Sequence, residues 1–185
     1  MRLASHDTFI LGELEAHREA WAHTGFVYRS GADLLLQHGE HYRGCPLPPS
    51  VAPGRPGLCF RDAAELALER EGLRYVEGVI TDGIGVVNHA WLIDPDGTVI
   101  DPALATVADT PEEFSRFAYL GAIFRPELVL EYAARLGVHS APLLDRIGPD
   151  LQPEMPAGTA GLADYRSDWP ILRVPYDPTR ATLAP

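Results

Sequence analysis

Apolar residues recur at helical spacing in two stretches near the start of the chain. The first stretch runs from about Phe9 to His23, and Gly25 is placed to end it. In the second, Ser30 is a good N-cap for a short helix that contains three successive leucines and ends near Gly39. The pattern therefore predicts two N-terminal helices.

A long loop and a third helix follow. The stretch from Cys45 to Gly57 contains five prolines and two glycines, so it cannot form regular structure. From Cys59 to about Glu71 the chain is rich in alanine, leucine and glutamate, which are strong helix formers, and Gly72 follows as a stop. The loop thus leads to a helix that begins with a cysteine.

Three strands are predicted next, at residues 75–81, 85–94 and 98–101, because these stretches alternate in polarity or run apolar. After them, Pro111 and two glutamates predict a short helix, since proline at the first helical position and acids in the first turn both favour one. Helices followed by a sheet indicate an α+β fold.

The rest of the chain predicts one more helix and a tail. The segment Tyr119–Phe124 is predicted to be a buried strand or a turn, and Pro126 opens a helix that reaches about Leu136 before Gly137. Residues 149–185 are rich in proline and glycine and lack periodicity. We therefore expect a single domain over residues 1–148 and a Pro-rich C-terminal tail over 149–185, which either wraps the domain or is partly disordered.

The turn between the last two predicted strands fixes how they pair. The three-residue loop Pro95-Asp96-Gly97 suits a type I turn with a glycine bulge, in which Gly97 takes the left-handed conformation. Ile93 then faces Val99, and Trp91 faces Asp101. His89 lies on the same face as Trp91 and diagonal to Asp101, within reach of its side chain. A two-residue loop would send Asp101 to the opposite face.

Composition and charge limit the class of protein. The 185 residues are 46% hydrophobic with a formal net charge of −11, and the acidic residues are scattered. A basic footprint is missing, which argues against nucleic acid or an anionic membrane surface as the main partner. No secretory signal is visible, and no apolar stretch approaches the ~18 residues of a membrane helix. Two cysteines cannot build a disulfide framework, so we expect a cytoplasmic protein without a Cys45–Cys59 bridge.

Three residue types in one order point to covalent chemistry. A cysteine attacks as its thiolate, which the partial positive charge and free N–H groups of a helix N-terminus stabilise, and Cys59 stands at such a position. The same N–H groups are candidates for binding an oxyanion. Considered one at a time, Cys59 and His89 are expected to be core residues, and Asp101 is expected to cap the end of a strand. In sequence, a cysteine at a helix start, a histidine on a strand and an aspartate ending the next strand favour a catalytic triad.

The segment from Leu58 to Ala103 resembles the transglutaminase-like core of the papain-related cysteine enzymes. The residues that carry the resemblance are the helix-initial Cys59, the His-Ala-Trp at His89–Trp91 and the Asp-Pro at Asp101–Pro102. The resemblance covers about a quarter of the chain. It implies a papain-like core in which the helix bearing the cysteine packs on a small antiparallel sheet. It also implies that Cys59 is the nucleophile, His89 the general base and acid, and Asp101 the orienting carboxylate.

The chain is also similar to uncharacterised bacterial and phage proteins that continue into an aromatic-Gly-aliphatic segment like Tyr119–Phe124. Two features depart from the family pattern. Glu77 stands where family members often have an apolar or small residue, and the short linker between Cys59 and His89 omits the substrate-binding insertions of larger transglutaminases. The family includes peptidases, amidases, acyl transferases and members that have lost activity, so it leaves the substrate open.

These observations predict a thiol-dependent enzyme that hydrolyses a peptide or amide bond through an acyl-thioester. The alternatives are an amide-forming, acyl-transfer or leader-peptide-cleaving enzyme of a biosynthetic pathway, and a non-catalytic binding module on the same scaffold. The expected partner is a peptide, a protein or a small amide or ester. No cofactor is expected, and the oligomeric state stays open.

Several residues beside the predicted triad have less defined roles. Trp91 is expected to form a wall beside the histidine or to bind substrate. A side-chain oxyanion donor could come from Asn88, Gln37 or Tyr42, although Asn88 points away from His89 on a regular strand. The cluster of His38, Glu40 and His41 lacks an obvious further ligand and is not expected to bind a metal.

Overall fold

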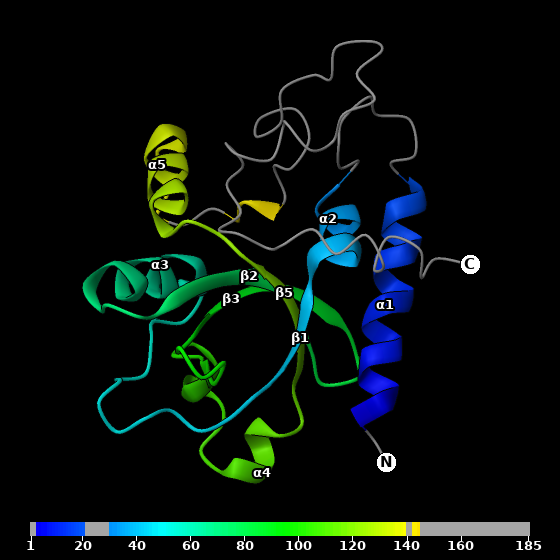
Figure 1. Cartoon of the computed structure of the whole chain (residues 1–185), viewed down its shortest axis with the longest axis horizontal. Coiled ribbons are helices and arrows are strands. Elements are labelled where there is room, and N and C mark those ends of the chain that lie inside the picture. Colours follow the sequence, from blue (N-terminus) through cyan, green and yellow to red (C-terminus); the bar gives the residue numbers. More distant parts are fainter. Residues whose placement is uncertain (1–2, 21–29, 140–141, 145–185) are drawn as a thin grey trace.

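The computed structural model describes residues 3–20, 30–139 and 142–144. Two N-terminal helices, α1 (Leu3–Ala20) and α2 (Gly31–His38), lie side by side (Figure 1). The side-chain oxygen of Ser30 accepts a hydrogen bond from the Asp33 N–H at 3.2 Å, which confirms the predicted cap.

The predicted start of the first helix at Phe9 is wrong, because α1 already begins at Leu3. The added turns are polar, so hydrophobic spacing did not reveal them. They are held by tertiary contacts: the Asp7 carboxylate pairs with His41 Nδ1 at 3.2 Å and accepts a hydrogen bond from Arg43 Nη1 at 3.0 Å. The predicted stop at Gly25 lies outside the described residues, as does the predicted tail over 149–185.

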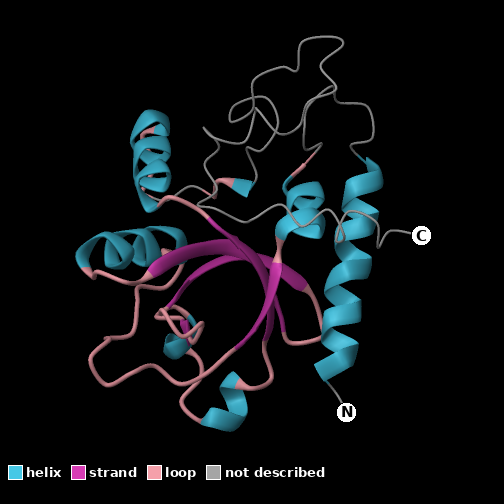
Figure 2. Cartoon of the chain, viewed as in Figure 1, coloured by secondary structure: helices cyan, strands magenta, loops and turns pink. Residues whose placement is uncertain are grey.

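The sheet has five strands in the order β1-β5-β2-β3-β4, and every pair of neighbours is antiparallel. Figure 2 shows the strands in magenta, with helices around them. The strands are β1 (Glu40–Arg43), β2 (Arg74–Thr81), β3 (Val86–Ile93), β4 (Val99–Ile100) and β5 (Ala118–Ile123). The mixture of helices and an antiparallel sheet confirms the α+β class. The segment predicted as a strand or a turn is strand β5, whereas β1 was not predicted.

Three further helices match the predictions closely. They are α3 (Cys59–Glu69), α4 (Pro111–Phe114) and α5 (Pro126–Leu136), with a short 3-10 helix η1 (Leu104–Thr106) before α4. Helix α3 begins at Cys59 as predicted and ends two residues before the predicted Glu71. Gly137 ends α5 with a positive φ of 68°, a conformation that favours glycine.

The two faces of the sheet bury different cores. The first core lies between the sheet and the helices α1, α2, α3 and α5, and it includes Ile10, Leu34, Ala64, Tyr75 and Val129. The second lies on the other face, beneath η1 and α4, and it includes Trp91, Leu104, Phe114 and Tyr119. Period-two alternation along β3 therefore sends Trp91 to one core and Leu92 to the other.

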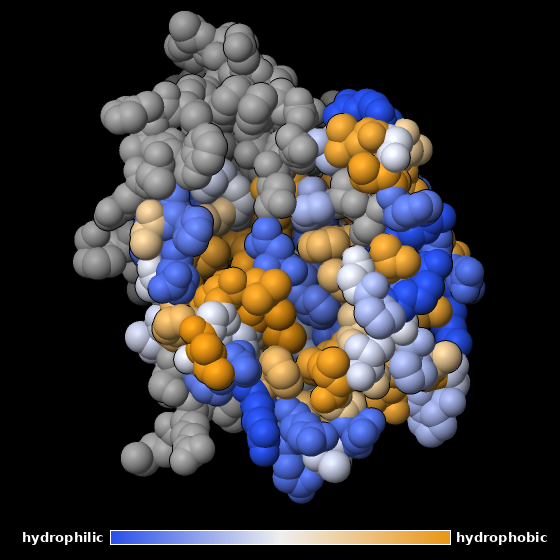
Figure 3. All heavy atoms as spheres, turned by 180° about the vertical axis from the view of Figure 1, so that it is seen from behind, coloured by the Kyte–Doolittle hydropathy of each residue, from blue (hydrophilic) through white to orange (hydrophobic). Residues whose placement is uncertain are grey.

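Apolar side chains also reach the surface. Seen from behind, the molecule carries apolar residues grouped among hydrophilic ones (Figure 3). The most exposed large apolar side chains in the described ranges are Ile84, Val107 and Val87. None of the described helices is both long and apolar enough to cross a membrane.

Candidate active site

The β3–β4 hairpin has the predicted register. The N–H of Asp94 donates to the Thr98 carbonyl at 3.1 Å, and the N–H of Gly97 donates to the Asp94 carbonyl at 3.0 Å. Gly97 has a positive φ of 82°, as the glycine bulge requires. Ile93 pairs with Val99. Two residues away from this pair on each strand, Trp91 therefore lies opposite Asp101. His89, two residues before Trp91, lies on the same face of β3.

Asp101 is fully buried, and three groups bind its carboxylate. His89 Nε2 lies 2.7 Å from Oδ2. The backbone N–H of Leu104, at the start of η1, donates to Oδ1 at 2.9 Å. The hydroxyl of Tyr119 donates to Oδ2 at 3.0 Å. A carboxylate with its hydrogen bonds satisfied on both oxygens is fixed in place and orients the imidazole.

Tyr119 is a site residue that the sequence reasoning missed. It lies on β5, opposite Ile80 of β2, and its ring is buried beside His89 at a centroid distance of 6.4 Å. Burial and the Asp101 charge raise the pKa of Tyr119, so its hydroxyl stays a donor. The aromatic residue in the Tyr119–Phe124 segment was a visible signal. To assign Tyr119 to the site, one must know that β5 pairs with β2, and these strands are far apart in the sequence.

His89 connects the carboxylate to the thiol. Burial lowers the pKa of His89, but hydrogen bonds to Asp101 and Cys59, together with their negative charges, outweigh burial and raise it from 6.5 to about 10. Because Asp101 takes Nε2, the ring nitrogen left for the Cys59 sulfur is Nδ1. The imidazole therefore holds its proton through the neutral range, beside the Asp101 carboxylate.

Cys59 approaches His89 around an open edge of the sheet. Helix α3 packs on the face of the first core, whereas His89 projects from β3 toward the second. Strand β4 pairs only with Leu92 and Ile93, so among the described strands none covers this edge of β3 beside His89. Both groups remain partly accessible: Cys59 is half-buried and the His89 side chain is 12% exposed.

The start of α3 leaves its amides available. Leu58 stands at the N-cap and makes no side-chain cap hydrogen bond, unlike Ser30 of α2 and Thr110 of α4. An apolar N-cap leaves the first N–H groups of a helix without the partner that a serine or threonine would supply. These groups surround the Cys59 backbone, where an oxyanion formed on an attacked carbonyl would lie.

Aromatic rings form the wall behind His89. Trp91 is fully buried, stacks on His89 at 6.2 Å with an interplanar angle of 20°, and meets the edge of Tyr119 at 4.9 Å. The Tyr42 ring meets the Trp91 indole edge to face, with a centroid distance of 5.7 Å. The structure thus gives Trp91 the position of a wall, and direct contact with substrate stays a prediction.

Glu77, which departs from the family pattern, is fully buried on the opposite face of the sheet from His89. Its carboxylate accepts a hydrogen bond from the Tyr75 hydroxyl at 2.7 Å and from the Leu144 N–H at 2.6 Å. These bonds tie the segment after α5 to β2. We interpret Glu77 as a structural residue that joins two parts of the first core.

The other candidates from the sequence lie away from the triad or stay unassigned. The Tyr42 hydroxyl donates to Glu40 at 3.3 Å, and Asn88 is exposed on the face of β3 opposite to His89. Gln37 lies on α2, which packs against β5. Within the described residues no group of three or more His, Cys, Asp or Glu side chains could hold a metal ion.

The second cysteine belongs to the structural core. The Cys45 thiol donates to the Val99 carbonyl at 2.8 Å and packs against the second core. Burial and the nearby Asp94 charge raise its pKa despite that hydrogen bond. Cys45 and Cys59 are both free thiols. The two thiols therefore have different surroundings, and Cys45 provides an internal reference for the reactivity of Cys59.

An exposed apolar side chain flanks the site. Val87 lies two positions before His89 on the same face of β3 and is 62% exposed. Most other apolar residues of this strand are buried.

Comparison with known proteins gives no neighbour: no family model, no curated protein and no solved structure matches the chain with significance. The class of the molecule is therefore defined by its own geometry. It is an α+β protein in which a strand histidine lies 2.7 Å from a buried aspartate, and a helix-initial cysteine contributes to the raised pKa of that histidine.

Proposed function

We propose that the chain is a cysteine hydrolase with a Cys59–His89–Asp101 triad that cleaves peptide or amide bonds through an acyl-thioester. The observation that carries the proposal is the double engagement of His89. Its Nε2 lies 2.7 Å from a fully buried carboxylate, and Asp101 and Cys59 together raise its pKa to about 10. An imidazole held between an orienting carboxylate and a thiol is the arrangement that nucleophilic catalysis requires.

Acylation would proceed as follows. The Cys59 thiolate attacks the carbonyl carbon, a C–S bond forms, and the carbonyl electron pair becomes an oxyanion beside the uncapped N–H groups of α3. The His89 imidazolium then gives its proton to the amide nitrogen, and the C–N bond breaks. The amine leaves, and an acyl-thioester and a neutral imidazole remain.

Deacylation would use the same imidazole as a base. Once the sulfur is acylated, the Cys59 charge and its hydrogen bond no longer raise the pKa of His89, so that pKa falls. The neutral ring accepts a proton from water as the water oxygen attacks the thioester carbonyl. The C–S bond breaks, the thiolate leaves, and the acyl group departs as a carboxylic acid.

The scaffold supports assignment to the transglutaminase-like, papain-related enzymes. The elements follow the order that the resemblance implies: a helix that begins at the cysteine, a strand with the histidine and a shorter strand that ends before the aspartate. The α3 helix packs on an antiparallel sheet, mainly against β3 and β2. Cytoplasmic location belongs to the same proposal, as do peptide, protein or small amide substrates.

Alkylation by iodoacetamide across pH 5–9, read at each cysteine by peptide mass spectrometry, tests the nucleophile. We expect Cys59 to react rapidly at pH 6, where an ordinary thiol with a pKa of about 8.5 is almost wholly protonated. Cys45 serves as the reference thiol in the same sample. In a His89→Ala variant the reaction of Cys59 at pH 6 should slow to that of an ordinary thiol. If Cys59 gains reactivity only above about pH 8, as an ordinary thiol does, the triad is not an activated one.

An activated ester, p-nitrophenyl acetate, tests the fate of the acyl group. Acetylation of Cys59 that turns over in water supports a hydrolase, and its loss in Cys59→Ala assigns the thiol. Preferential formation of an acetyl-amine product on addition of glycinamide would indicate an acyl transferase instead. A protein with neither rapid alkylation nor acetylation at Cys59 would be the binding module.

A further inference from the structure

The proposed triad is divided between two parts of the fold. Cys59 begins α3, whereas Asp101 follows the end of β4 and holds His89 on β3. The proline-rich loop before α3 lies beside both the start of α3 and the strand end at Asp101. Hydrogen bonds between that loop and each part would fix the distance between the sulfur and the imidazole.

Two consecutive residues of the loop make those bonds. The N–H of Gly54 donates to the Pro102 carbonyl at 2.7 Å, directly after Asp101. The N–H of Arg55 donates to Asp62 Oδ2 at 2.6 Å, in the first turn of α3. We call Gly54 and Arg55 the strap, because their adjacent amides join the strand end to the cysteine helix.

The strap fits without room for a side chain at Gly54. A Cβ there would lie 2.9 Å from Asp62 Oδ2 and 3.2 Å from Pro102 atoms. The backbone therefore approaches both parts as closely as a glycine allows. The loop makes a further contact at its end, where the N–H of Leu58 donates to the Arg55 carbonyl at 3.1 Å.

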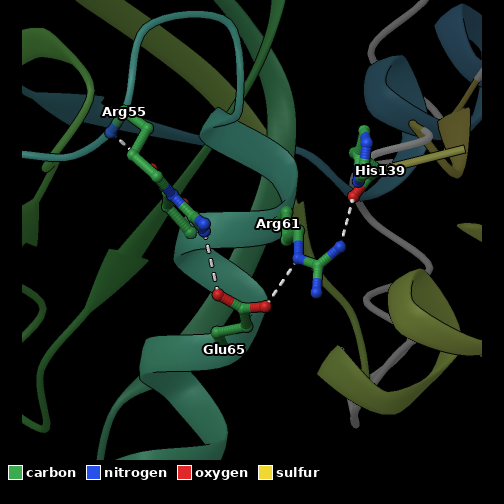
Figure 4. Close-up of polar contacts among 5 residues, drawn as sticks. Arg55, Arg61, Glu65 and His139 are labelled. Atoms are coloured by element: carbon green, nitrogen blue, oxygen red, sulfur yellow. Dashed lines mark hydrogen bonds and ion pairs between the residues drawn. The ribbon is translucent and has the colours of Figure 1, made fainter.

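Asp62 is the residue of α3 on which the strap depends. Its side chain is only 10% exposed, and it accepts the Arg55 N–H instead of capping its own helix. The Arg55 guanidinium also pairs with Asp62. It donates to Glu65 at 2.9 Å as well (Figure 4). That side chain is 55% exposed, so solvent screens its ion pairs. The bond from the backbone amide to the carboxylate is the better shielded contact.

We propose that Asp62 is a positioning residue, which acts through the Gly54–Arg55 strap to hold the Cys59 sulfur against the imidazole of His89. This inference rests on the proposed function of the triad. Asp62 touches neither the sulfur nor the imidazole in any contact described above. It acts by fixing the first turn of α3 relative to the Asp101–Pro102 strand end.

The test compares Asp62→Ala with Asp62→Asn, an isosteric variant that keeps an oxygen acceptor for the Arg55 N–H. Arg55→Gln is the matched control, because it removes the guanidinium and keeps the backbone N–H. All variants are alkylated with iodoacetamide over pH 5–9, and their unfolding temperatures are measured in parallel so that only folded protein is compared.

In Asp62→Ala we expect alkylation of Cys59 at pH 6 to slow by on the order of tenfold, because a small displacement of the reacting groups is enough for that loss. Asp62→Asn should stay within about threefold of the wild type, since the acceptor is retained. Arg55→Gln should stay within about twofold, as the loss of a screened ion pair predicts. The rate profile of Cys45 should not change in any variant.

A folded Asp62→Ala protein with the wild-type pH profile would overturn the positioning role. So would an Asp62→Asn or Arg55→Gln protein as slow as Asp62→Ala, because the backbone bond would then not be the contact that matters. If Asp62→Ala does not fold, Gly54→Ala replaces it, and a wild-type profile there overturns the role equally. Failure of the proposed function is a separate result: the wild-type protein itself would show no rapid reaction of Cys59 at pH 6.

Discussion

Replacing Asp101 with asparagine should release the proton that His89 holds. The substitution keeps the size of the side chain and removes the negative charge 2.7 Å from Nε2. The amide oxygen of asparagine can still accept the bond from the Leu104 N–H, and its NH2 group can donate to the Tyr119 hydroxyl oxygen, so both neighbours keep a hydrogen-bond partner. The change therefore isolates the electrostatic role of the carboxylate.

The magnitude follows from the pKa of His89. Its rise from 6.5 to about 10 corresponds to on the order of 5 kcal/mol in favour of the charged ring. The hydrogen bond to Asp101 is the largest of the causes that raise this pKa, ahead of the contact with Cys59. We expect the pKa of His89 in the variant to fall by at least two units, which is about 3 kcal/mol.

The assay is an NMR titration of the imidazole carbon resonances in protein labelled at histidine, with His89 assigned by a His89→Gln variant. Wild-type His89 should remain charged up to a pH of about 10. In Asp101→Asn its titration should move to about pH 8 or lower. A midpoint within half a unit of the wild-type value would refute the argument that Asp101 holds the proton.

The same pKa fixes the sign of a stability effect. A histidine with a folded-state pKa above its unfolded value contributes stability below the unfolded pKa, near 6.5, and loses it as the pH rises through about 10. The wild type should therefore exceed Asp101→Asn in unfolding temperature most clearly at pH 5–6.5, and the difference should shrink toward pH 10. A difference that grows with pH over this range would contradict a charged His89.

Substitutions at Gly121, Trp91 and Tyr119 test the packing around the site by urea unfolding, and Gly12→Ala is a control. Gly121→Ala should cost about 1–3 kcal/mol because its Cβ would fall on the Trp91 ring, whereas Gly12→Ala, with open space on helix α1, should stabilise by about 0.5–1 kcal/mol. Trp91→Phe should cost clearly less than the ~3–5 kcal/mol of Trp91→Ala, because the buried indole N–H has no partner among the described residues. Tyr119→Phe removes the hydroxyl bound to Asp101 and should cost about 1.5–3 kcal/mol. Equal stability of Gly121→Ala and Gly12→Ala, equal cost of the two Trp91 variants, or a neutral Tyr119→Phe would each contradict the packing described here.

Local chemistry explains why much of the fold was predictable. The Pro95-Asp96-Gly97 turn determines the β3–β4 register through three residues, and that register alone brings His89 near Asp101. Proline and glycine likewise mark both ends of α5, at Pro126 and Gly137. Cys59 was placed at a helix start because the prolines before it exclude helix and the residues after it favour one. Each of these signals acts within a few residues.

The features that were missed depend on contacts between distant residues. Strand β1 is four residues long, and only pairing with β5 makes it a strand. The first turns of α1 are polar, and contacts with β1 hold them. Tyr119 reaches Asp101 because β5 lies beside β2, between β1 and β2 in the sheet. Short-range patterns carry no information about such pairings, so sequence alone did not yield them.

The link between the thiol and the histidine can be examined without any substrate. Alkylation of Cys59 removes its charge and its hydrogen bond to the imidazole and leaves Asp101 in place, as an acyl group would. The pKa of His89 should therefore fall from about 10, while the Asp101 bond still supports the charged form. The measurement is the histidine NMR titration, repeated on carbamidomethylated protein, with a Cys45→Ser background so that a single thiol is modified.

A midpoint unchanged by the modification would mean that the Cys59 charge does not act on the ring. The imidazole would then have no means of becoming a base after acylation at neutral pH, and the deacylation step proposed above would fail with it.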